Sequence, residues 1–446
     1  MGGLQFMSAI KKMINNNYKF FSKRKEKEED ETKKVQNNKI EQSSIAGKWT
    51  LLSGKNKWEG LLDPLDDDLR RYIIHYGEMA QATYDNFNRQ KASKFTGSWR
   101  YSKQSMFEMV GLEKGNPFKY SVTKYVHATS SIPVPDAFIV KSEWNRESNW
   151  IGYVAVATDE GAAALGRRDI VVAWRGTVRS LEWVNDFEFA FVEAPKIFGD
   201  SAAAADHPKV HLGWYSIYAS DDPKSPLTNI SARDQVLAEI SRLVNQYKNE
   251  QISITIVGHS MGAAVGTLNA VDIVINVLNK GVARNSAYPV TAFLFASPRV
   301  GDINFKNAIS KLQDNLHILR VRNGLDIVPN YPLIGFGDVG EVLPIDTTKS
   351  EYLKVPGDFT TWHSLEAYLH GVAGYQGAKG QFKIEKGIRD IALVNKHLDA
   401  LKDEYSVPSS WWVDKNNGMV QQDDRTWILM DHEDADFSPN SNSSYK

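Results

Sequence analysis

The chain has 446 residues, a formal net charge of −1, no cysteine and a hydrophobic fraction of 42%. The length can hold a large core in more than one domain, and the near-neutral charge gives no electrostatic case for nucleic-acid binding. The absence of cysteine excludes a disulfide scaffold, a thiol nucleophile and thiolate metal sites, and it fits an intracellular protein. Because no run of 18 or more apolar residues occurs, we expect no transmembrane helix.

Both ends of the chain are expected to lie outside the folded part. Residues 1–44 contain a weak apolar periodicity near 6–14 and then a charged, apolar-poor stretch. This composition favours an unfolded extension, with an amphipathic membrane-surface helix at 6–21 as the alternative. The segment 431–446 is acidic and then rich in serine and asparagine, which predicts a disordered tail. Residues 45–430 are therefore predicted to form a single domain.

Apolar runs of strand length alternate with stretches of helical periodicity between these ends. Helices are predicted at 69–80 and 234–247, and strands at 153–157, 169–174, 252–257, 290–295 and 317–321. Such alternation is typical of the α/β class, with a central, mostly parallel sheet that is flanked by helices and mixed at its edges.

The most informative stretch is Gly258-His259-Ser260-Met261-Gly262, which follows the predicted strand 252–257 and precedes a run of small residues. A G-x-S-x-G pattern between a strand and a helix is a nucleophile elbow, which exposes the serine hydroxyl above the sheet. The alternative is an ordinary strand–glycine–helix turn. The context favours Ser260 as a nucleophile, with the following helix offering N–H groups to an oxyanion.

A serine nucleophile needs a neutral imidazole as its base and a carboxylate that orients the imidazole. In α/β hydrolases the carboxylate follows a strand after the serine. Asp326 stands in the turn that follows the predicted strand at 317–321. It is better placed than Asp314, Asp338 and Asp346. An Asn-Gly turn with an Asx cap is the structural alternative for Asp326.

Four histidines follow Asp326, namely His363, His370, His397 and His432. His432 falls in the acidic tail, and His397 falls in a predicted helix at 391–401 as a surface residue. His363 opens a helical run, from which an imidazole can swing over the edge of a sheet. On spacing alone, His370 remains its rival.

An oxyanion hole in this arrangement takes one N–H from Met261 and a second from an upstream turn after a strand. Gly176 and Thr177 follow the predicted strand 169–174, and the Thr177 N–H and hydroxyl are the candidate donors. A simple strand-ending glycine is the alternative.

A short apolar helix is predicted directly after this turn. Leu181 and Val184 are three residues apart, and Trp183 and Phe187 are four apart. These side chains would form either a core-packing helix or a lid over an apolar acyl pocket.

Taken together, these motifs resemble the class 3 (fungal-type) lipase family. The segments that carry the resemblance are 174–177, 180–186, 210–214, 258–262, 295–301, 326–329 and the stretch from His363 to Leu369. The opening 49–76 resembles more narrowly the cytosolic type II group of the plant phospholipase A1 branch. The similarity runs from about residue 45 to about 415.

The resemblance implies an α/β-hydrolase fold and a serine hydrolase that cleaves the sn-1 acyl ester of glycerophospholipids. It implies Ser260, Asp326 and His363 as the triad, supports Thr177 and Met261 at the oxyanion hole, and favours His363 over His370. No metal or cofactor is expected, and the expected partner is a lipid at a membrane or micelle surface, met by a cytoplasmic protein in peripheral contact. A non-catalytic lipase-like adaptor and a short-chain carboxylesterase remain alternatives, and the sequence leaves the oligomeric state open.

Overall fold

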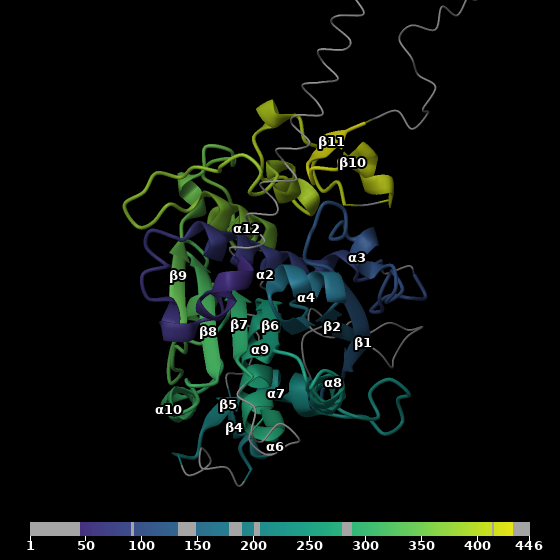
Figure 1. Cartoon of the computed structure of the whole chain (residues 1–446), viewed down its shortest axis with the longest axis vertical. Helices are drawn as coiled ribbons and strands as arrows, with labels where there is room; N and C mark the ends of the chain where they lie inside the picture. The colour runs from purple at the N-terminus through teal and green to yellow at the C-terminus, as the bar shows by residue number, and fades with distance from the viewer. Residues whose placement is uncertain are drawn as a thin grey trace, which may run out of the picture.

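Seven strands form one sheet in the order β1-β2-β3-β6-β7-β8-β9 (Figure 1). The structure, a computed structural model, describes residues 45–90, 93–132, 149–177, 190–199, 206–278, 288–412 and 414–430. The strands are β1 Tyr120–Ala128, β2 Asn149–Ala157, β3 Arg168–Trp174, β6 Ile252–His259, β7 Val290–Phe295, β8 Leu316–Asn323 and β9 Glu341–Ile345. The predicted extensions 1–44 and 431–446 lie outside the described residues.

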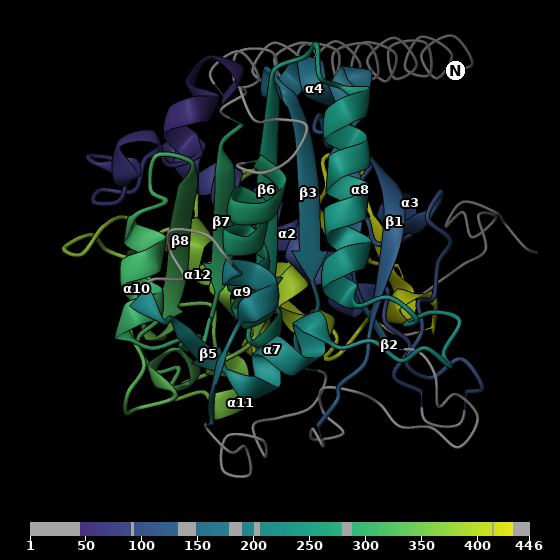
Figure 2. The ribbon, with the colours of Figure 1, turned by 90° about the horizontal axis from the view of Figure 1, so that it is seen from below.

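The five strands from β3 to β9 are parallel, and only β1 and β2 run antiparallel to their neighbours. The register pairs Trp174 with Gly258, and His259 with Phe295. The carboxyl ends of β3, β6 and β7 therefore meet at one edge of the sheet, on the side of the molecule where α7 (Leu212–Ala219) and α11 (Phe359–Trp362) lie (Figure 2). The predicted α/β fold with a mostly parallel, edge-mixed sheet is confirmed.

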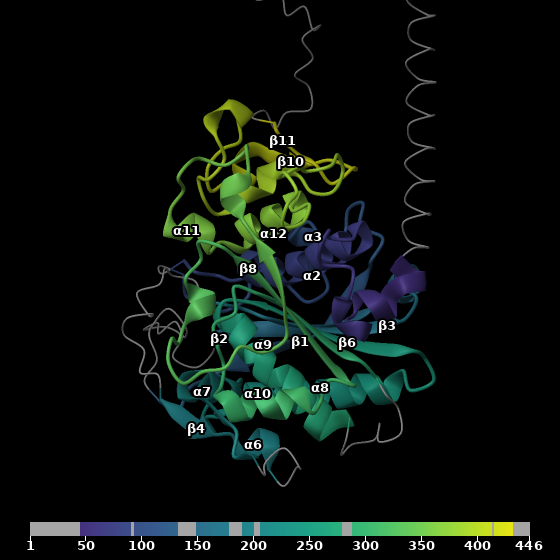
Figure 3. The ribbon, with the colours of Figure 1, turned by 90° about the vertical axis from the view of Figure 1, so that its left-hand side faces the viewer.

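Helices cover both faces of the sheet, in the arrangement of an α/β hydrolase (Figure 3). On one face lie α2 (Asp67–Asp85) and α12 (Leu365–Gly374), and on the other lie α7, α8 (Ala232–Gln246) and α9 (Met261–Asp272). Every residue of β2, β3, β6 and β7 is buried. Their continuous apolar runs follow from this, because strands covered on both faces need no polar alternation.

Smaller elements complete the chain. They are residues 45–52 in helical conformation, α3 Met106–Met109, α4 Asp159–Leu165, β4 Phe191–Glu193, α6 Pro195–Phe198, β5 Lys209–His211, α10 Ile303–Ser310, β10 Met419–Gln421 and β11 Trp427–Leu429, with short turns of 3-10 or π-helix between them. The pair β10 and β11 lies with α3 and α12 on the α2 side of the sheet (Figure 3).

Sequence periodicity located most of the central elements but missed both edge strands of the sheet, β1 and β9. The predicted helix at 391–401 was wrong, because a 3-10 helix ends at Lys396 and the chain then turns. The sequence predicted His397 as a surface residue, which was also wrong. Its side chain is 16% exposed, and its Nε2 lies 2.8 Å from Oδ1 of buried Asp85.

The apolar segment that follows the elbow is long enough to resemble a membrane span. Residues Met261–Leu278 qualify by length and composition, but 94% of them are buried inside the fold. They are the central helix of the core, packed against β6 and β7 and against α7.

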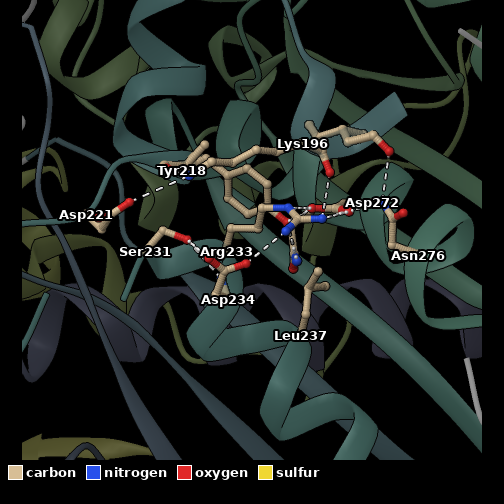
Figure 4. A network of polar contacts seen from close by, with 12 residues as sticks. Lys196, Tyr218, Asp221, Ser231, Arg233, Asp234, Leu237, Asp272 and Asn276 are labelled. Carbon is tan, nitrogen blue, oxygen red and sulfur yellow. Dashed lines mark hydrogen bonds and ion pairs between the residues drawn. The ribbon is translucent and has the colours of Figure 1, made fainter. Parts of the chain in front are cut away.

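One charge is buried within this helical layer, and it is fully compensated. Asp272 accepts hydrogen bonds from Arg233 at 2.6 and 3.0 Å, from the Tyr218 hydroxyl at 2.8 Å and from Asn276 at 2.6 Å (Figure 4). Burial raises the pKa of the Asp272 carboxyl, which the Arg233 cation opposes. The Arg233–Asp272 pair therefore ties α8 to α9.

Replacing Arg233 by methionine should strongly destabilise the fold, because it leaves the Asp272 carboxylate buried without its cation. We expect a loss of about 3–5 kcal/mol in the free energy of unfolding, measured by urea denaturation. The matched control is Arg242→Met on the same helix, where an exposed pair with Glu239 is worth at most about 1 kcal/mol. Equal losses in the two variants would contradict the assignment, and adding Asp272→Asn to Arg233→Met should recover part of the stability.

Candidate active site

Ser260 stands alone between β6 and α9, in a backbone conformation that L-residues rarely adopt. Its φ is 57° and its ψ is −127°, and its N–H donates to the Phe295 carbonyl at 2.9 Å. A Cβ on Gly258 would lie 2.4 Å from the Gly262 carbonyl oxygen, and a Cβ on Gly262 would lie 2.3 Å from the Trp174 carbonyl oxygen. Both glycines are thus required for the close approach that forms the elbow.

The structure brings Ser260, His363 and Asp326 into one hydrogen-bonded row. His363 Nε2 lies 2.9 Å from Ser260 Oγ, and His363 Nδ1 lies 2.7 Å from Asp326 Oδ2. The Asp326 side chain is fully buried, while that of His363 keeps 13% of its surface exposed. This order of hydroxyl, imidazole and carboxylate can remove a proton from Ser260 and hold the resulting imidazolium.

Two further donors fix the Asp326 carboxylate. The Tyr368 hydroxyl donates to Oδ2 at 2.7 Å, and the Val328 N–H donates to Oδ1 at 3.0 Å. The Tyr368 oxygen in turn accepts the N–H of Asn323 at 3.2 Å, at the end of β8. With the His363 ring, these donors satisfy both oxygens of the buried Asp326 carboxylate.

The other acids and histidines weighed from the sequence are engaged elsewhere. His370 hydrogen-bonds Ser350 at 2.7 Å, and burial lowers the pKa of His370 to about 3. Asp338 pairs with Arg299 and Arg320, and Asp346 caps a short 3-10 helix. Asp314 precedes β8 and so lies toward the opposite edge of the sheet, and His432 lies outside the described residues.

The candidate oxyanion donors come from two adjacent segments. Met261 is the first residue of α9, and no side chain caps this helix, in contrast to the caps that Asp66 and Ser231 give α2 and α8. The main chain of Trp174 and Arg175 touches Gly262, so the segment that leads to Thr177 lies against the first turn of α9. The arrangement leaves first-turn N–H groups beside Ser260, where negative charge would develop.

Buried Arg175 fixes the end of β3. Its guanidinium donates to the carbonyl oxygens of Trp150 and Gly176 at 3.0 and 2.8 Å and lies 3.9 Å from the Phe87 ring centroid. Burial lowers the pKa of Arg175 to about 10. Arg175 therefore holds the Gly176–Thr177 turn in place through the Gly176 carbonyl.

Sequence reasoning missed the side chains that support the triad through hydrogen bonds, namely those of Tyr84, His259 and Tyr368. The His259 ring, which precedes the serine, contacts the Tyr84 hydroxyl at 2.7 Å and the His363 carbonyl at 2.8 Å. Tyr84 comes from α2, 175 positions earlier in the chain, and no local pattern signals it. Tyr368 had a detectable signal, because it lies five positions after His363 on the predicted helix.

Two further expectations from the sequence were a lid and the lack of a metal ion. The predicted lid, with Leu181, Trp183, Val184 and Phe187, lies outside the described residues. Across the described ranges, no group of three or more His, Cys, Asp or Glu side chains is arranged to hold a metal ion.

Comparisons with known proteins agree on one family. The model of the class 3 lipase family matches residues 171–336. Phospholipase A1-IIgamma of Arabidopsis thaliana is 54% identical over 406 residues, covering 88% of this chain and 96% of its own. Phospholipase A1-II 1 of Oryza sativa subsp. indica is 52% identical, covering 88% of this chain and 98% of its own. Among solved structures, the nonglycosylated LIP2 lipase of Yarrowia lipolytica aligns at 17% identity over 64% of this chain and 82% of its own, with a TM-score of 0.43.

Removing the Tyr368 hydroxyl should destabilise the fold. Tyr368→Phe leaves the Asn323 N–H without its acceptor and withdraws one donor from buried Asp326, so we expect a loss of about 1–3 kcal/mol in the free energy of unfolding. Tyr375→Phe, at the C-cap of the same helix, is the control and should lose much less. Urea denaturation of the two variants side by side makes the comparison, and a neutral Tyr368→Phe would contradict it.

Proposed function

The chain belongs to the class 3 lipase family, with the plant type II phospholipases A1 as close relatives, and we propose that it hydrolyses the sn-1 acyl ester of glycerophospholipids. The observation that carries the proposal is the row from Ser260 Oγ through His363 to Asp326, with contacts of 2.9 and 2.7 Å on a strained elbow. Ser260 is the nucleophile, His363 the general base and Asp326 the carboxylate that orients it.

The reaction proceeds in two half-reactions. His363 Nε2 takes the Ser260 proton as Oγ attacks the ester carbonyl carbon, and the carbonyl oxygen becomes an oxyanion facing the N–H groups of Met261 and Thr177. Collapse of this tetrahedral state expels the lysophospholipid alkoxide, which receives the proton from His363. A water then attacks the acyl–serine in the same way, and the fatty acid leaves as Ser260 regains its proton.

The two alternative functions differ in what they require of this site. A non-catalytic adaptor has no need to keep Ser260, His363 and Asp326 within hydrogen-bond distance, so the row argues against it. A short-chain carboxylesterase would use the same row, but it has no need for an apolar surface around the site.

Exposed apolar side chains in the segment that carries Asp326 form an apolar rim, which supports contact with a lipid surface. We define it as Leu325, Ile327, Leu333 and Ile334, of which the first two flank Asp326 in the chain. Leu333 and Ile334 are 62% and 88% exposed. Arg299, just after β7, holds this loop in place by donating to the Pro332 carbonyl at 3.1 Å. Large apolar side chains held in water beside a lipid-cleaving site are suited to enter a bilayer surface.

The remaining parts of the proposal concern the lid and the location. The apolar residues Leu181, Trp183, Val184 and Phe187 would cover the acyl groove and open at the lipid surface, adding to the rim. A cytoplasmic location with peripheral membrane contact is supported by the cysteine-free composition.

Loss of the nucleophile tests the activity. Ser260→Ala should keep the fold and lower turnover by at least about 10³-fold, because the covalent route is lost. A fluorophosphonate should label wild-type protein at Ser260 and leave Ser260→Ala unlabelled. The position of the cleaved ester is measured with phosphatidylcholine that carries distinguishable acyl chains, from which we expect release of the sn-1 chain. Labelling of Ser260→Ala would refute the nucleophile, and preferential sn-2 release would refute the position.

A charged residue in the apolar rim should weaken binding to a lipid surface and leave the rate of ester hydrolysis in solution unchanged. Burying one isoleucine is worth about 1.5–3 kcal/mol, so Ile334→Asp should lower vesicle binding by about 10-fold or more. Turnover of a dissolved short-chain ester should stay near wild type. Ile428→Asp, in β11 away from the site, is the matched control and should leave both unchanged. Equal losses on vesicles and dissolved ester would remove the rim from lipid contact.

A further inference from the structure

A chain of close polar contacts joins four segments behind His363. The main chain of Gly176, just after β3, packs against the hydroxyl of Tyr84 at the end of α2. Tyr84 Oη lies 2.7 Å from His259 Nδ1, and His259 Nε2 lies 2.8 Å from the carbonyl oxygen of His363. Gly176 and His259 are buried, and Tyr84 is partly buried.

The chemistry of these groups fixes the direction of each bond. The His363 carbonyl can only accept, so His259 Nε2 carries a hydrogen. Burial lowers the pKa of His259 well below its usual range, with the neighbouring His363 adding to the effect, so the ring is neutral and Nδ1 is bare. Nδ1 therefore accepts the Tyr84 O–H. One tautomer of His259 satisfies every partner.

The main chain at His363 is held from a second side as well. Asn323, at the end of β8, donates from its side chain to the Trp362 carbonyl at 2.9 Å. Two consecutive carbonyls, those of Trp362 and His363, are thus fixed by side chains from β8 and β6. The imidazole of His363 keeps its 2.9 Å contact with Ser260 only while this main chain stays in place.

We propose that Tyr84 and His259 are a positioning pair: Tyr84 fixes the ring of His259, and His259 holds the His363 carbonyl so that the imidazole meets Ser260. The inference rests on the proposed function for the roles of Ser260 and His363. Without the Tyr84 hydroxyl, His259 Nδ1 loses the donor that holds it at 2.7 Å, and the ring is no longer fixed from that side. A shift of the ring weakens the bond from Nε2 to the His363 carbonyl, and the main chain that carries the imidazole can then move away from Ser260.

The pair also links the base to the oxyanion side of the site. A Cβ on Gly176 would lie 2.1 Å from the Tyr84 oxygen and 2.5 Å from the His259 carbonyl oxygen, which shows how closely these groups pack. The Gly176–Thr177 turn and the His363 loop therefore share one set of contacts. Loss of the hydroxyl should affect the chemical step and leave substrate binding nearly unchanged.

The test compares Tyr84→Phe with a matched buried tyrosine. We expect Tyr84→Phe to lower kcat by about 10- to 100-fold with KM within twofold, since a small misplacement of a base carries such a cost. The control is Tyr153→Phe, which removes a buried hydroxyl that donates to Met79 on the same helix at 2.7 Å. It should lose a similar amount of thermal stability and keep kcat.

Variants of His259 separate hydrogen bonding from shape. His259→Gln offers a donor and an acceptor at similar positions and should retain most activity, whereas His259→Leu should match the kcat loss of Tyr84→Phe. Adding Tyr84→Phe to His259→Leu should cause no further loss. A kcat for folded Tyr84→Phe within twofold of wild type would overturn the proposal, as would a purely additive double variant.

The rate of fluorophosphonate labelling at Ser260 keeps this test separate from the proposed substrate. It reports activation of the hydroxyl and needs no phospholipid. The positioning pair is supported if Tyr84→Phe is labelled more slowly than wild type while Tyr153→Phe is labelled at the wild-type rate. This holds even if wild-type protein proves inactive on phospholipid. Unchanged labelling in Tyr84→Phe overturns the pair even if phospholipid hydrolysis is found.

Discussion

The structure depends on one constraint, the strained backbone of Ser260 at the junction of β6 and α9. A residue at φ 57° and ψ −127° carries a conformational cost that its surroundings must offset. The Ser260 N–H is held by the Phe295 carbonyl of β7, and the Ser260 carbonyl accepts from the first turn of α9 at 3.0 and 3.2 Å. Close contact of Gly258 with Gly262, and of Gly262 with the end of β3, completes the support. The three parallel strands β3, β6 and β7 and the core helix α9 therefore together hold the Ser260 hydroxyl in place.

Polar groups in the interior hold the rest of the site to this point. Asp326 is fixed by His363, Tyr368 and Val328, and His363 is fixed through its main chain by His259 and Asn323. Each of these groups is buried or nearly so, where an unmade hydrogen bond is costly and a made one is geometrically strict. The same principle appears away from the site, where Arg233 and Asp272 join α8 to α9. Satisfied buried polarity thus fixes the relative placement of helices and loops that apolar packing alone would leave free to shift.

The two faces of the sheet contribute different groups to the site. The α2 and α12 side supplies Tyr84 and Tyr368, whose hydroxyls hydrogen-bond His259 and Asp326. The opposite side supplies α9, whose first-turn N–H groups have no side-chain cap. The apolar rim follows directly from the loop that carries Asp326. Ser260 and Asp326 both follow the carboxyl ends of parallel strands, which is where ligands generally bind in open α/β sheets.

The sequence by itself determined the class of the fold and the elbow, and it indicated Ser260 and Asp326, because strand runs, glycine spacing and turn chemistry are local signals. It left His363 and His370 as rivals, since both lie on one apolar helical stretch and distance to Ser260 is not a local property. It missed β1 and β9, which are mixed in burial and polarity, and it gave no sign of Tyr84 or of the role of the His259 side chain. Only tertiary structure decided these points, because they depend on which side chains α2, β6 and β8 bring together across more than a hundred residues. A hydrogen-bond partner is chosen by position in space, and periodicity along the chain carries no record of it.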